Sequence, residues 1–268
     1  MKKNLIILFV ISATLLVSGG CSKDDDTIPV YTFVLVHGAW QGPYVWATVK
    51  TKLESKGQKV IVVELPGHGV DTTAPVTLSI NIYRDKVIAA INNTTGKVIL
   101  VGHSMGGVVV SAVAEKIPER IKKLVYVGAF LPANGQSLLD LAFQDKQSLL
   151  GASLLPSADQ LTLDIIQKNI VSIFCQDASD EIKILAVSKF RVEPAIPFTN
   201  KAVLTDANFG KVDKYYISTL QDHAIGINLQ NQMITSAHIS KVYSINTGHY
   251  PFLSKPDDLV NIFTDIIK

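Results

Sequence analysis

The feature that most constrains the fold is the stretch from Val98 to Gly107, VILVGHSMGG, in a chain of 268 residues. Four apolar residues lead directly into Gly102. Ser104 and Gly106 then follow at spacings of two, and mostly small and apolar residues come after them. This order predicts a buried strand, a sharp turn and a helix. Small residues two before and two after Ser104 let strand and helix approach closely, which exposes the serine hydroxyl on the turn.

Apolar and β-branched runs recur on both sides of this stretch. We expect five further strands, at residues 31–36, 59–64, 123–128, 214–220 and 241–245, and further helices at residues 43–57, 78–93 and 256–267. The runs are continuously apolar rather than alternating, as is typical of parallel strands covered by helices on both faces. The predicted fold class is therefore α/β with a mostly parallel sheet.

The pattern changes from about residue 131 to about residue 205. Helical spacing dominates there, at residues 136–150, 158–170 and 179–190, and four prolines interrupt it without a convincing strand. At 47% apolar content the chain can bury one large core. Length and composition alone allow one large domain or two small ones, but the helical segment resembles an insertion rather than a separate domain. We therefore expect one domain at residues 31–268 with a helical cap at about residues 131–205.

The first thirty residues are expected to lie outside this domain. Two lysines precede a short apolar run at residues 5–17, and small residues follow, which predicts a secretory signal peptide over residues 1–20. The layout resembles that of bacterial lipoproteins, with Cys21 as the lipidated residue and residues 21–30 as a tether. The resemblance implies export and anchoring to the outer membrane or cell surface. Ser18 departs from it, because such signals usually carry Leu or Val there, so a soluble secreted protein stays an alternative.

The charge balance excludes the usual kind of nucleic-acid surface. Removal of residues 1–20 takes away two of the 25 basic side chains and none of the 23 acidic ones, which leaves 23 of each. Without a basic cluster we expect no nucleic-acid partner, and any membrane contact would come from the lipid alone. The six histidines are scattered and Cys175 has no partner besides Cys21, so we expect no metal, no cofactor and no disulfide.

Three polar side chains carry the predicted chemistry. Ser104, Asp222 and His249 each lie just past an expected strand, where the loops of a parallel sheet form active sites. A serine needs an imidazole to take its proton, and the imidazole needs a carboxylate to fix its tautomer and stabilise its charged form. Asp206 and Asp213 compete with Asp222 but precede or begin the strand, and His249 has an alternative as an ordinary turn residue.

The oxyanion of an attacked ester needs two backbone N–H donors. Met105, directly after the nucleophile, is expected to supply one donor, and Ala39 in the loop after the first strand the other. His37 is expected to shape that loop, whereas His68 and His223 are expected to be turn residues without a role in chemistry. The candidate substrate-binding residues are His37, Gly38, His103, Phe130, Leu131 and Tyr250.

Four segments, FVLVHGAWQGPYVW, VVELPGHGVD, VILVGHSMGG and KLVYVGAFLP, together resemble the α/β-hydrolase superfamily. They are most similar to its branch of plant methyl esterases, hydroxynitrile lyases and related bacterial esterases, and YYISTLQDHAI with TGHYPFLSKP extends the resemblance to the C-terminus. The resemblance covers residues 31–268 and is weakest over residues 131–198. It implies the α/β-hydrolase fold, a helical cap as a lid over Ser104, and a triad of Ser104, Asp222 and His249.

Three positions separate esterases from lyases in this branch. The lyases carry Thr, Glu and Lys where this chain has Gly38, His103 and Tyr250, and a tyrosine offers no cation for leaving cyanide. The resemblance therefore implies a serine esterase that cleaves a small or medium carboxylic ester through an acyl-serine. A non-catalytic ligand-binding member of the fold, a surface interaction protein with a vestigial site, and a hydroxynitrile lyase stay open as alternatives.

Overall fold

The computed structural model describes residues 29–268. The expected signal peptide, Cys21 and most of the expected tether lie outside these residues, so export and lipidation stay predictions. Within residues 29–268 no helix combines the length and the apolar content needed to cross a bilayer. Over the same residues, His, Cys, Asp and Glu side chains form no group of three or more that could hold a metal ion.

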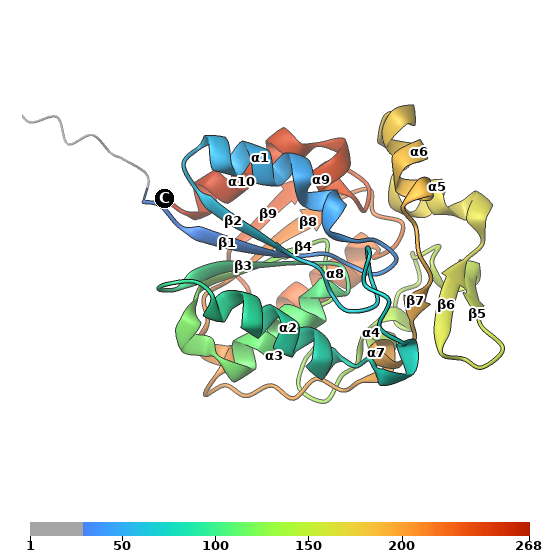
Figure 1. Ribbon diagram of the computed structural model, residues 1–268, viewed down its shortest axis with the longest axis horizontal. Helices are drawn as coiled ribbons and strands as arrows, with labels where there is room; N and C mark the ends of the chain where they lie inside the picture. Colours follow the sequence, from blue (N-terminus) through green and yellow to red (C-terminus); the bar gives the residue numbers. More distant parts are fainter. Residues whose placement is uncertain (1–28) are drawn as a thin grey trace, which may run out of the picture.

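Six parallel strands form the central sheet in the order β2-β1-β3-β4-β8-β9 (Figure 1). They are β1 (Thr32–Val36), β2 (Lys59–Val63), β3 (Val98–His103), β4 (Ile121–Val127), β8 (Lys214–Thr219) and β9 (Val242–Ile245). Each overlaps a strand expected from the sequence. Every residue of β3 is buried, because helices cover both faces of the sheet, and this explains the continuous apolar run.

Helices pack in pairs on the two faces of the sheet (Figure 1). α1 (Ala47–Ser55) and α10 (Pro256–Ile266) cover one face, and α2 (Ile80–Asn92) and α3 (Gly106–Lys116) cover the other. A further helix, α8 (Ile227–Ser236), packs on β8 and has no counterpart in the sequence prediction. The short helices are η1 (Pro43–Trp46), η2 (Pro75–Thr77), η3 (Pro118–Arg120), η4 (Gly151–Ser153), η5 (Gln167–Asn169), η6 (Phe209–Lys211) and α9 (Pro251–Ser254).

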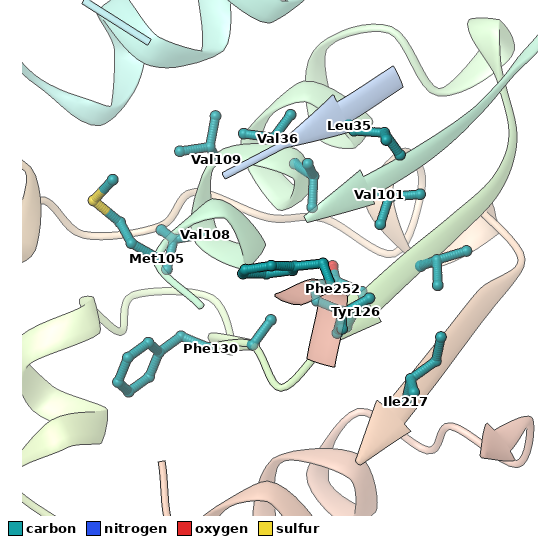
Figure 2. Packing of buried hydrophobic residues seen from close by; sticks show 14 of the residues in the cluster. Leu35, Val36, Val101, Met105, Val108, Val109, Tyr126, Phe130, Ile217 and Phe252 are labelled. Carbon is teal, nitrogen blue, oxygen red and sulfur yellow. The ribbon is translucent and has the colours of Figure 1, made fainter. Parts of the chain in front are cut away.

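The core lies between these helices and the sheet. Leu35, Val101 and Ile217, from three different strands, are fully buried there (Figure 2). Burial of each such side chain is worth about 1.5–3 kcal/mol relative to exposure. The core therefore holds the strand ends in fixed register, with Val36 of β1 opposite Gly102 of β3.

The chain reverses its direction across the sheet at β1. The connection through α1 places β2 on one side of β1, and the connection through α2 places β3 on the other side. The loops after β1 and β3 therefore diverge, which leaves a crevice at their carboxyl ends. The predicted oxyanion loop and Ser104 occupy these two loops, so the topology alone brings them together.

The segment between β4 and β8 forms a cap at the carboxyl ends of the strands (Figure 1). Its helices are α4 (Leu138–Ala142), α5 (Ile170–Phe174), α6 (Asp180–Ser188) and α7 (Ile196–Thr199). It also contains an antiparallel sheet that the sequence prediction lacked, formed by β5 (Leu154–Pro156), β6 (Thr162–Ile165) and β7 (Glu193–Pro194).

The helix expected at residues 158–170 is therefore wrong over most of its length. Residues 157–160 form a turn in which Gln160 has a φ of 58°, and this turn reverses the chain so that β5 and β6 pair. In a segment this short, the apolar residues Leu161, Leu163 and Ile165 have the spacing of two that suits a strand, but some of them also fit a helical pattern.

Candidate active site

Ser104 lies on the turn between β3 and α3 in a backbone conformation that serine rarely adopts. Its φ of 53° is in the left-handed region. The turn is tight: a Cβ on Gly102 would lie 2.6 Å from the carbonyl oxygen of Gly106, and a Cβ on Gly106 would lie 2.8 Å from that of His37. Glycine is therefore needed at both positions for the close approach that a nucleophile elbow requires.

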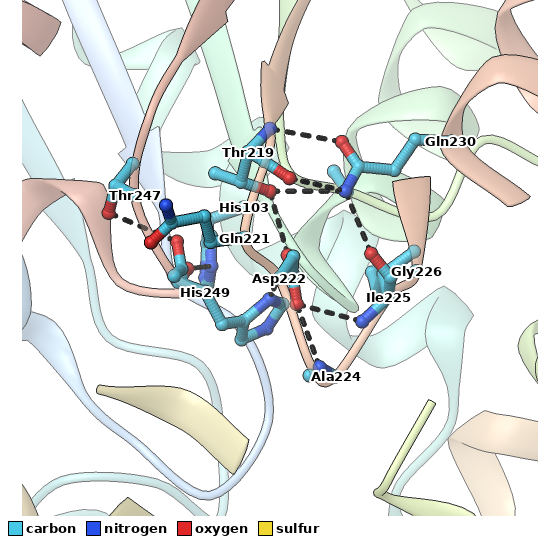
Figure 3. Close-up of polar contacts among 12 residues, drawn as sticks. His103, Thr219, Gln221, Asp222, Ala224, Ile225, Gly226, Gln230, Thr247 and His249 are labelled. Carbon is cyan, nitrogen blue, oxygen red and sulfur yellow. Dashed lines mark hydrogen bonds and ion pairs between the residues drawn. The ribbon is translucent and has the colours of Figure 1, made fainter. Parts of the chain in front are cut away.

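Asp222 and His249 meet just beyond β8 and β9. Nδ1 of His249 lies 2.7 Å from Oδ2 of Asp222, which also accepts the hydroxyl of Thr219 at 2.7 Å (Figure 3). The other oxygen, Oδ1, accepts the backbone N–H groups of Ala224 and Ile225, both at 2.8 Å. Because a carboxylate only accepts, the proton of neutral His249 is assigned to Nδ1, which leaves Nε2 free to take another.

Gln230 of α8 bonds the loop that carries Asp222. Its side chain accepts the backbone N–H of Thr219 at 3.1 Å and donates to the carbonyl oxygen of Ile225 at 2.7 Å (Figure 3). The sequence prediction missed Gln230 and Thr219, because neither belongs to a motif and α8 was not anticipated. The two competing acids lie elsewhere: Asp206 is exposed, and Asp213 pairs with Lys241 at 2.7 Å.

His103 supports His249 from behind. The centroids of the two rings are 4.6 Å apart, and Nε2 of His103 donates to the carbonyl oxygen of His249 at 2.8 Å. Burial lowers the pKa of His103 well below its usual value, and the neighbouring His249 lowers it further. His103 is therefore a neutral ring that bonds the backbone of His249, and its role in substrate binding stays a prediction.

The loop after β1 lies directly against the nucleophile. A Cβ on Gly38 would lie 2.6 Å from the Cβ of Ser104. In the part of the chain that the structure describes, no protein acceptor takes the backbone N–H of Ala39 or that of Met105. Both residues are buried, and buried N–H groups rarely lack an acceptor. The two donors are thus suited to a bound oxyanion.

His37 gives this loop its shape. Its Nδ1 donates to the carbonyl oxygen of Gly38 at 2.8 Å, and its Nε2 accepts the N–H of Leu65 at 3.3 Å. Burial lowers the pKa of His37 to about 3, with a contribution from the neighbouring His68. The ring is therefore neutral and structural, and it orients the Gly38 peptide.

The remaining substrate-binding candidates lie in different places: Phe130 and Tyr250 contact Ser104 and His249, whereas the N–H of Leu131 donates to the sulfur of Met233 on α8 at 3.2 Å. The N–H of Phe130 donates to the carbonyl oxygen of Ser104 at 3.1 Å, and Figure 2 shows Phe130 and Met105 beyond the strand ends. Phe130, Leu131 and Tyr250 are all buried, and their role in substrate binding stays a prediction.

The cap packs against His249 and Tyr250. Phe174 of α5 stacks on Tyr250, with ring centroids 5.4 Å apart, and its ring centroid lies 5.7 Å from that of His249. Ser104 is only 6% exposed and His249 only 1% exposed. The site is therefore shielded from bulk solvent in this conformation.

The two histidines expected in turns differ from each other. His223 lies in a turn and its Nδ1 donates to the carbonyl oxygen of Ser172 at 2.7 Å. His68 also lies in a turn, but its ring is buried and forms an ion pair with Glu193 of β7, at 2.8 Å. Nothing in the sequence indicated this pair, because its members are 125 residues apart.

Comparison with known proteins adds to this geometry. A family model described as "Alpha/beta hydrolase family" matches residues 33–262. "Putative methylesterase 11, chloroplastic" from Arabidopsis thaliana is 33% identical over 259 residues, which cover 91% of this chain and 65% of that protein. This chain thus spans less than two-thirds of that relative's length, and it covers 55% of methylesterase 13 from the same plant, whose name is also qualified as putative.

Two shorter Arabidopsis thaliana relatives align over nearly their whole length. Methylesterase 1 is 29% identical over 251 residues, covering 87% of this chain and 95% of that protein. An alpha-hydroxynitrile lyase is 29% identical over 255 residues, covering 87% and 96%. Among solved structures, polyneuridine aldehyde esterase superposes with a TM-score of 0.80 at 23% identity, covering 90% of this chain and all of that one. The pyrethroid hydrolase PytH does so with a TM-score of 0.79 at 22% identity, covering 89% and 97%.

Proposed function

The chain belongs to the alpha/beta hydrolase family, and from this premise we propose that it is a serine esterase for small or medium carboxylic esters. The observation that carries the proposal is the hydrogen-bonded pair of Asp222 and His249 at the same sheet edge as Ser104 on its strained turn. The unpaired N–H groups of Ala39 and Met105 and the esterases among the relatives support it.

The proposed reaction proceeds by acyl transfer. Nε2 of His249 takes the proton of Ser104 as Oγ bonds to the ester carbonyl carbon, and the carbonyl oxygen becomes an oxyanion that accepts from Ala39 and Met105. Asp222 stabilises the imidazolium of His249, which returns its proton to the leaving alcohol as the ester C–O bond breaks. Water, activated by His249, then attacks the acyl-serine and releases the acid.

The surroundings of Ser104 favour an apolar acid part. The side chains of Phe130 and Met105 lie at the strand ends (Figure 2). The ring of Phe174, from the cap, lies beside that of His249. An ester series that lengthens the acyl chain while the alcohol is held constant tests this preference, because an apolar acyl pocket raises kcat/KM by severalfold per added methylene until the pocket is full.

A hydroxynitrile lyase is the second candidate, because one relative is such an enzyme. Leaving cyanide requires a cation, and Tyr250 stands where those lyases carry Lys. Burial raises the pKa of Tyr250 well above its usual value, so the side chain stays neutral. At Gly38, where the lyases carry Thr, a Cβ would collide with Ser104. Both positions favour the esterase.

The proposed function is tested with a fluorophosphonate probe and a short p-nitrophenyl ester. Wild-type protein is expected to react with the probe and hydrolyse the ester, whereas Ser104→Ala takes no label and loses at least about 10³-fold in kcat/KM. Wild-type activity no higher than that of Ser104→Ala would instead identify a non-catalytic ligand-binding member. Cyanide release from mandelonitrile above the spontaneous rate would identify a lyase.

A further inference from the structure

Trp40 follows the proposed oxyanion donor Ala39, and the cap binds all three of its polar atoms. Its backbone N–H donates to Oε2 of Glu193 at 2.7 Å, and its carbonyl oxygen accepts the N–H of Arg191 at 3.0 Å. Its indole Nε1–H donates to the carbonyl oxygen of Leu163 in β6 at 2.9 Å. The cap is thus bonded to the core at Trp40, the residue next to the proposed oxyanion donor.

The backbone of Trp40 would not hold its conformation unaided. Its φ of 60° lies in the left-handed region, which costs a bulky residue about 1–2 kcal/mol relative to ordinary conformations. The bond from Glu193 to the Trp40 N–H fixes the peptide that joins Ala39 to Trp40. The Ala39 N–H belongs to the preceding peptide, whose carbonyl oxygen bonds His37. Release of the Ala39–Trp40 peptide would therefore act on that N–H through the dihedral angles of Ala39, as the chain relaxes toward negative φ at Trp40.

Glu193 is itself held by His68. Oε2 of Glu193 lies 2.8 Å from Nε2 of His68 while also accepting from Trp40, and Nδ1 of His68 lies 3.0 Å from the carbonyl oxygen of Pro66. Both ring nitrogens therefore face acceptors, so both carry protons and the ring is an imidazolium. The side chains are 2% and 0% exposed, which makes this a buried ion pair between the core and the cap.

A buried ion pair is an expensive way to attach a cap. Desolvation of two charges commonly offsets their attraction, and apolar residues of similar volume often stabilise a fold as well or better. This pair does more than attach the cap, because the same carboxylate oxygen accepts the N–H of Trp40, next to Ala39. Its geometry is suited to fixing the orientation of that backbone.

We propose that Glu193, held by His68, is a positioning residue of the oxyanion hole, which fixes the Ala39–Trp40 peptide so that the Ala39 N–H faces the substrate oxygen at Ser104. The inference rests on the proposed function. It implies that the hole is complete only when the cap is seated, because β7 of the cap supplies the carboxylate.

The central test compares Glu193→Gln with Glu181→Gln, an exposed cap residue on α6. In Glu193→Gln the counter-charge of His68 is gone, and a neutral His68 donates from only one ring nitrogen. It therefore loses its bond either to position 193 or to the carbonyl oxygen of Pro66, and the side chain that binds the Trp40 N–H is held less firmly. We expect kcat on a short p-nitrophenyl ester to fall roughly 10- to 100-fold with KM within about threefold, since a displacement of about 1 Å has this effect on rate. Glu181→Gln should match wild type. An unchanged kcat in folded Glu193→Gln would overturn the proposal.

The pH profile separates positioning from loss of stability. Four groups face or approach His68: Glu193 and Arg191 from the cap, the His37 ring at 4.9 Å and the Tyr83 ring of α2 at 5.6 Å. Burial lowers the pKa of His68, but the charge and hydrogen bond of Glu193 outweigh this and raise it overall. Wild-type kcat should therefore decline as pH rises through that raised pKa, and Glu193→Gln should lack the decline. An identical alkaline limb in both proteins would contradict the proposal.

Backbone amide NMR signals make the outcome independent of turnover. In selectively ¹⁵N-labelled protein, Glu193→Gln should shift the Ala39 and Trp40 signals, and Glu181→Gln should not. Unmoved Ala39 signals overturn the positioning role even in an active enzyme. The Ala39 and Trp40 signals could also shift in Glu193→Gln while wild-type protein shows no Ser104-dependent reaction. That result would support the positioning role and overturn only the proposed function. If Glu193→Gln unfolds, Glu193→Asp keeps the charge but shortens its reach, and the same signals are expected to move.

Discussion

The two halves of the candidate site are held in different ways. Every bond to the Asp222 carboxylate, and the bond from His103 to the backbone of His249, begins and ends in core elements. Cap residues do contact the Asp222 loop: the Leu149 N–H donates to the carbonyl oxygen of His223, and Nδ1 of His223 donates to that of Ser172. Among the described residues, however, no cap residue bonds the Asp222 carboxylate itself. The oxyanion loop, in contrast, is bound at Trp40 by three cap residues, Leu163, Arg191 and Glu193.

This difference assigns separate tasks to core and cap. Proton transfer needs a rigid pair, and the core network holds Asp222 and His249. Charge stabilisation by the hole becomes effective when the cap is closed and water is excluded. A cap displaced by mutation should therefore impair oxyanion stabilisation before it impairs the Asp222–His249 pair.

The largest expected effect falls on the core-held half. In Asp222→Asn the amide would face His249 with a donor and favour the wrong tautomer, so we expect kcat to fall about 10³- to 10⁴-fold with little change in KM. Assay on a short p-nitrophenyl ester checks this, with Asp213→Asn as the surface control. A smaller loss than in Glu193→Gln would reverse the ranking of the two halves.

A smaller effect is expected where the halves meet. A Cβ at Gly38 would lie 2.6 Å from the Cβ of Ser104, whereas nothing lies within 4 Å of a Cβ at Gly151 in the cap. Gly38→Ala should therefore displace the nucleophile and lower kcat roughly 10- to 100-fold, while Gly151→Ala leaves kinetics unchanged. Equal kinetics in the two variants would show that the oxyanion loop adapts, and the contrast between a rigid core and a cap-held loop would weaken.

The smallest effect is on the free energy of unfolding. Its pH dependence has one sign for His37 and His103 and the opposite sign for His68, which bonds Glu193 of the cap. His37 and His103 have lowered pKa values in the folded protein, so the stability they contribute is lost as pH falls below about 6.5, the ordinary pKa of histidine. For His37 the loss continues down to its folded-state pKa of about 3. His68 has a raised pKa, so its contribution is present at low pH and is lost as pH rises through that value.

Urea unfolding between pH 5 and pH 9 measures both slopes, each up to about 1.4 kcal/mol per pH unit for one histidine. Glu193→Gln should flatten the alkaline side only, because it removes the charge that keeps His68 protonated. A change confined to the acid side would contradict the conclusion that Glu193 of the cap keeps His68 charged.

Predictability from sequence follows the same division. The placement of Ser104, Asp222 and His249 at one sheet edge could be predicted, because each follows an apolar strand and a parallel sheet gathers such loops at one edge. Their catalytic roles stay a prediction. β6 and the pair of His68 and Glu193 were not found. A strand of four residues leaves no period to read, and a contact across 125 residues depends on how the cap folds back, which no local pattern encodes. Gln230 was missed for a similar reason, because it bonds backbone groups of Thr219 and Ile225 whose positions are known only once the loop is folded.

The antiparallel sheet of the cap has a consequence for protein engineering. Leu163 and Glu193, two of the groups that hold Trp40, lie on its paired strands β6 and β7, whereas His68 lies in the core. A chimera that exchanges the cap for that of another hydrolase would separate an acid from its base, and leave one buried charge unmatched. Successful cap transplants into this scaffold should therefore carry the acid at position 193 along, or replace His68 in the same step.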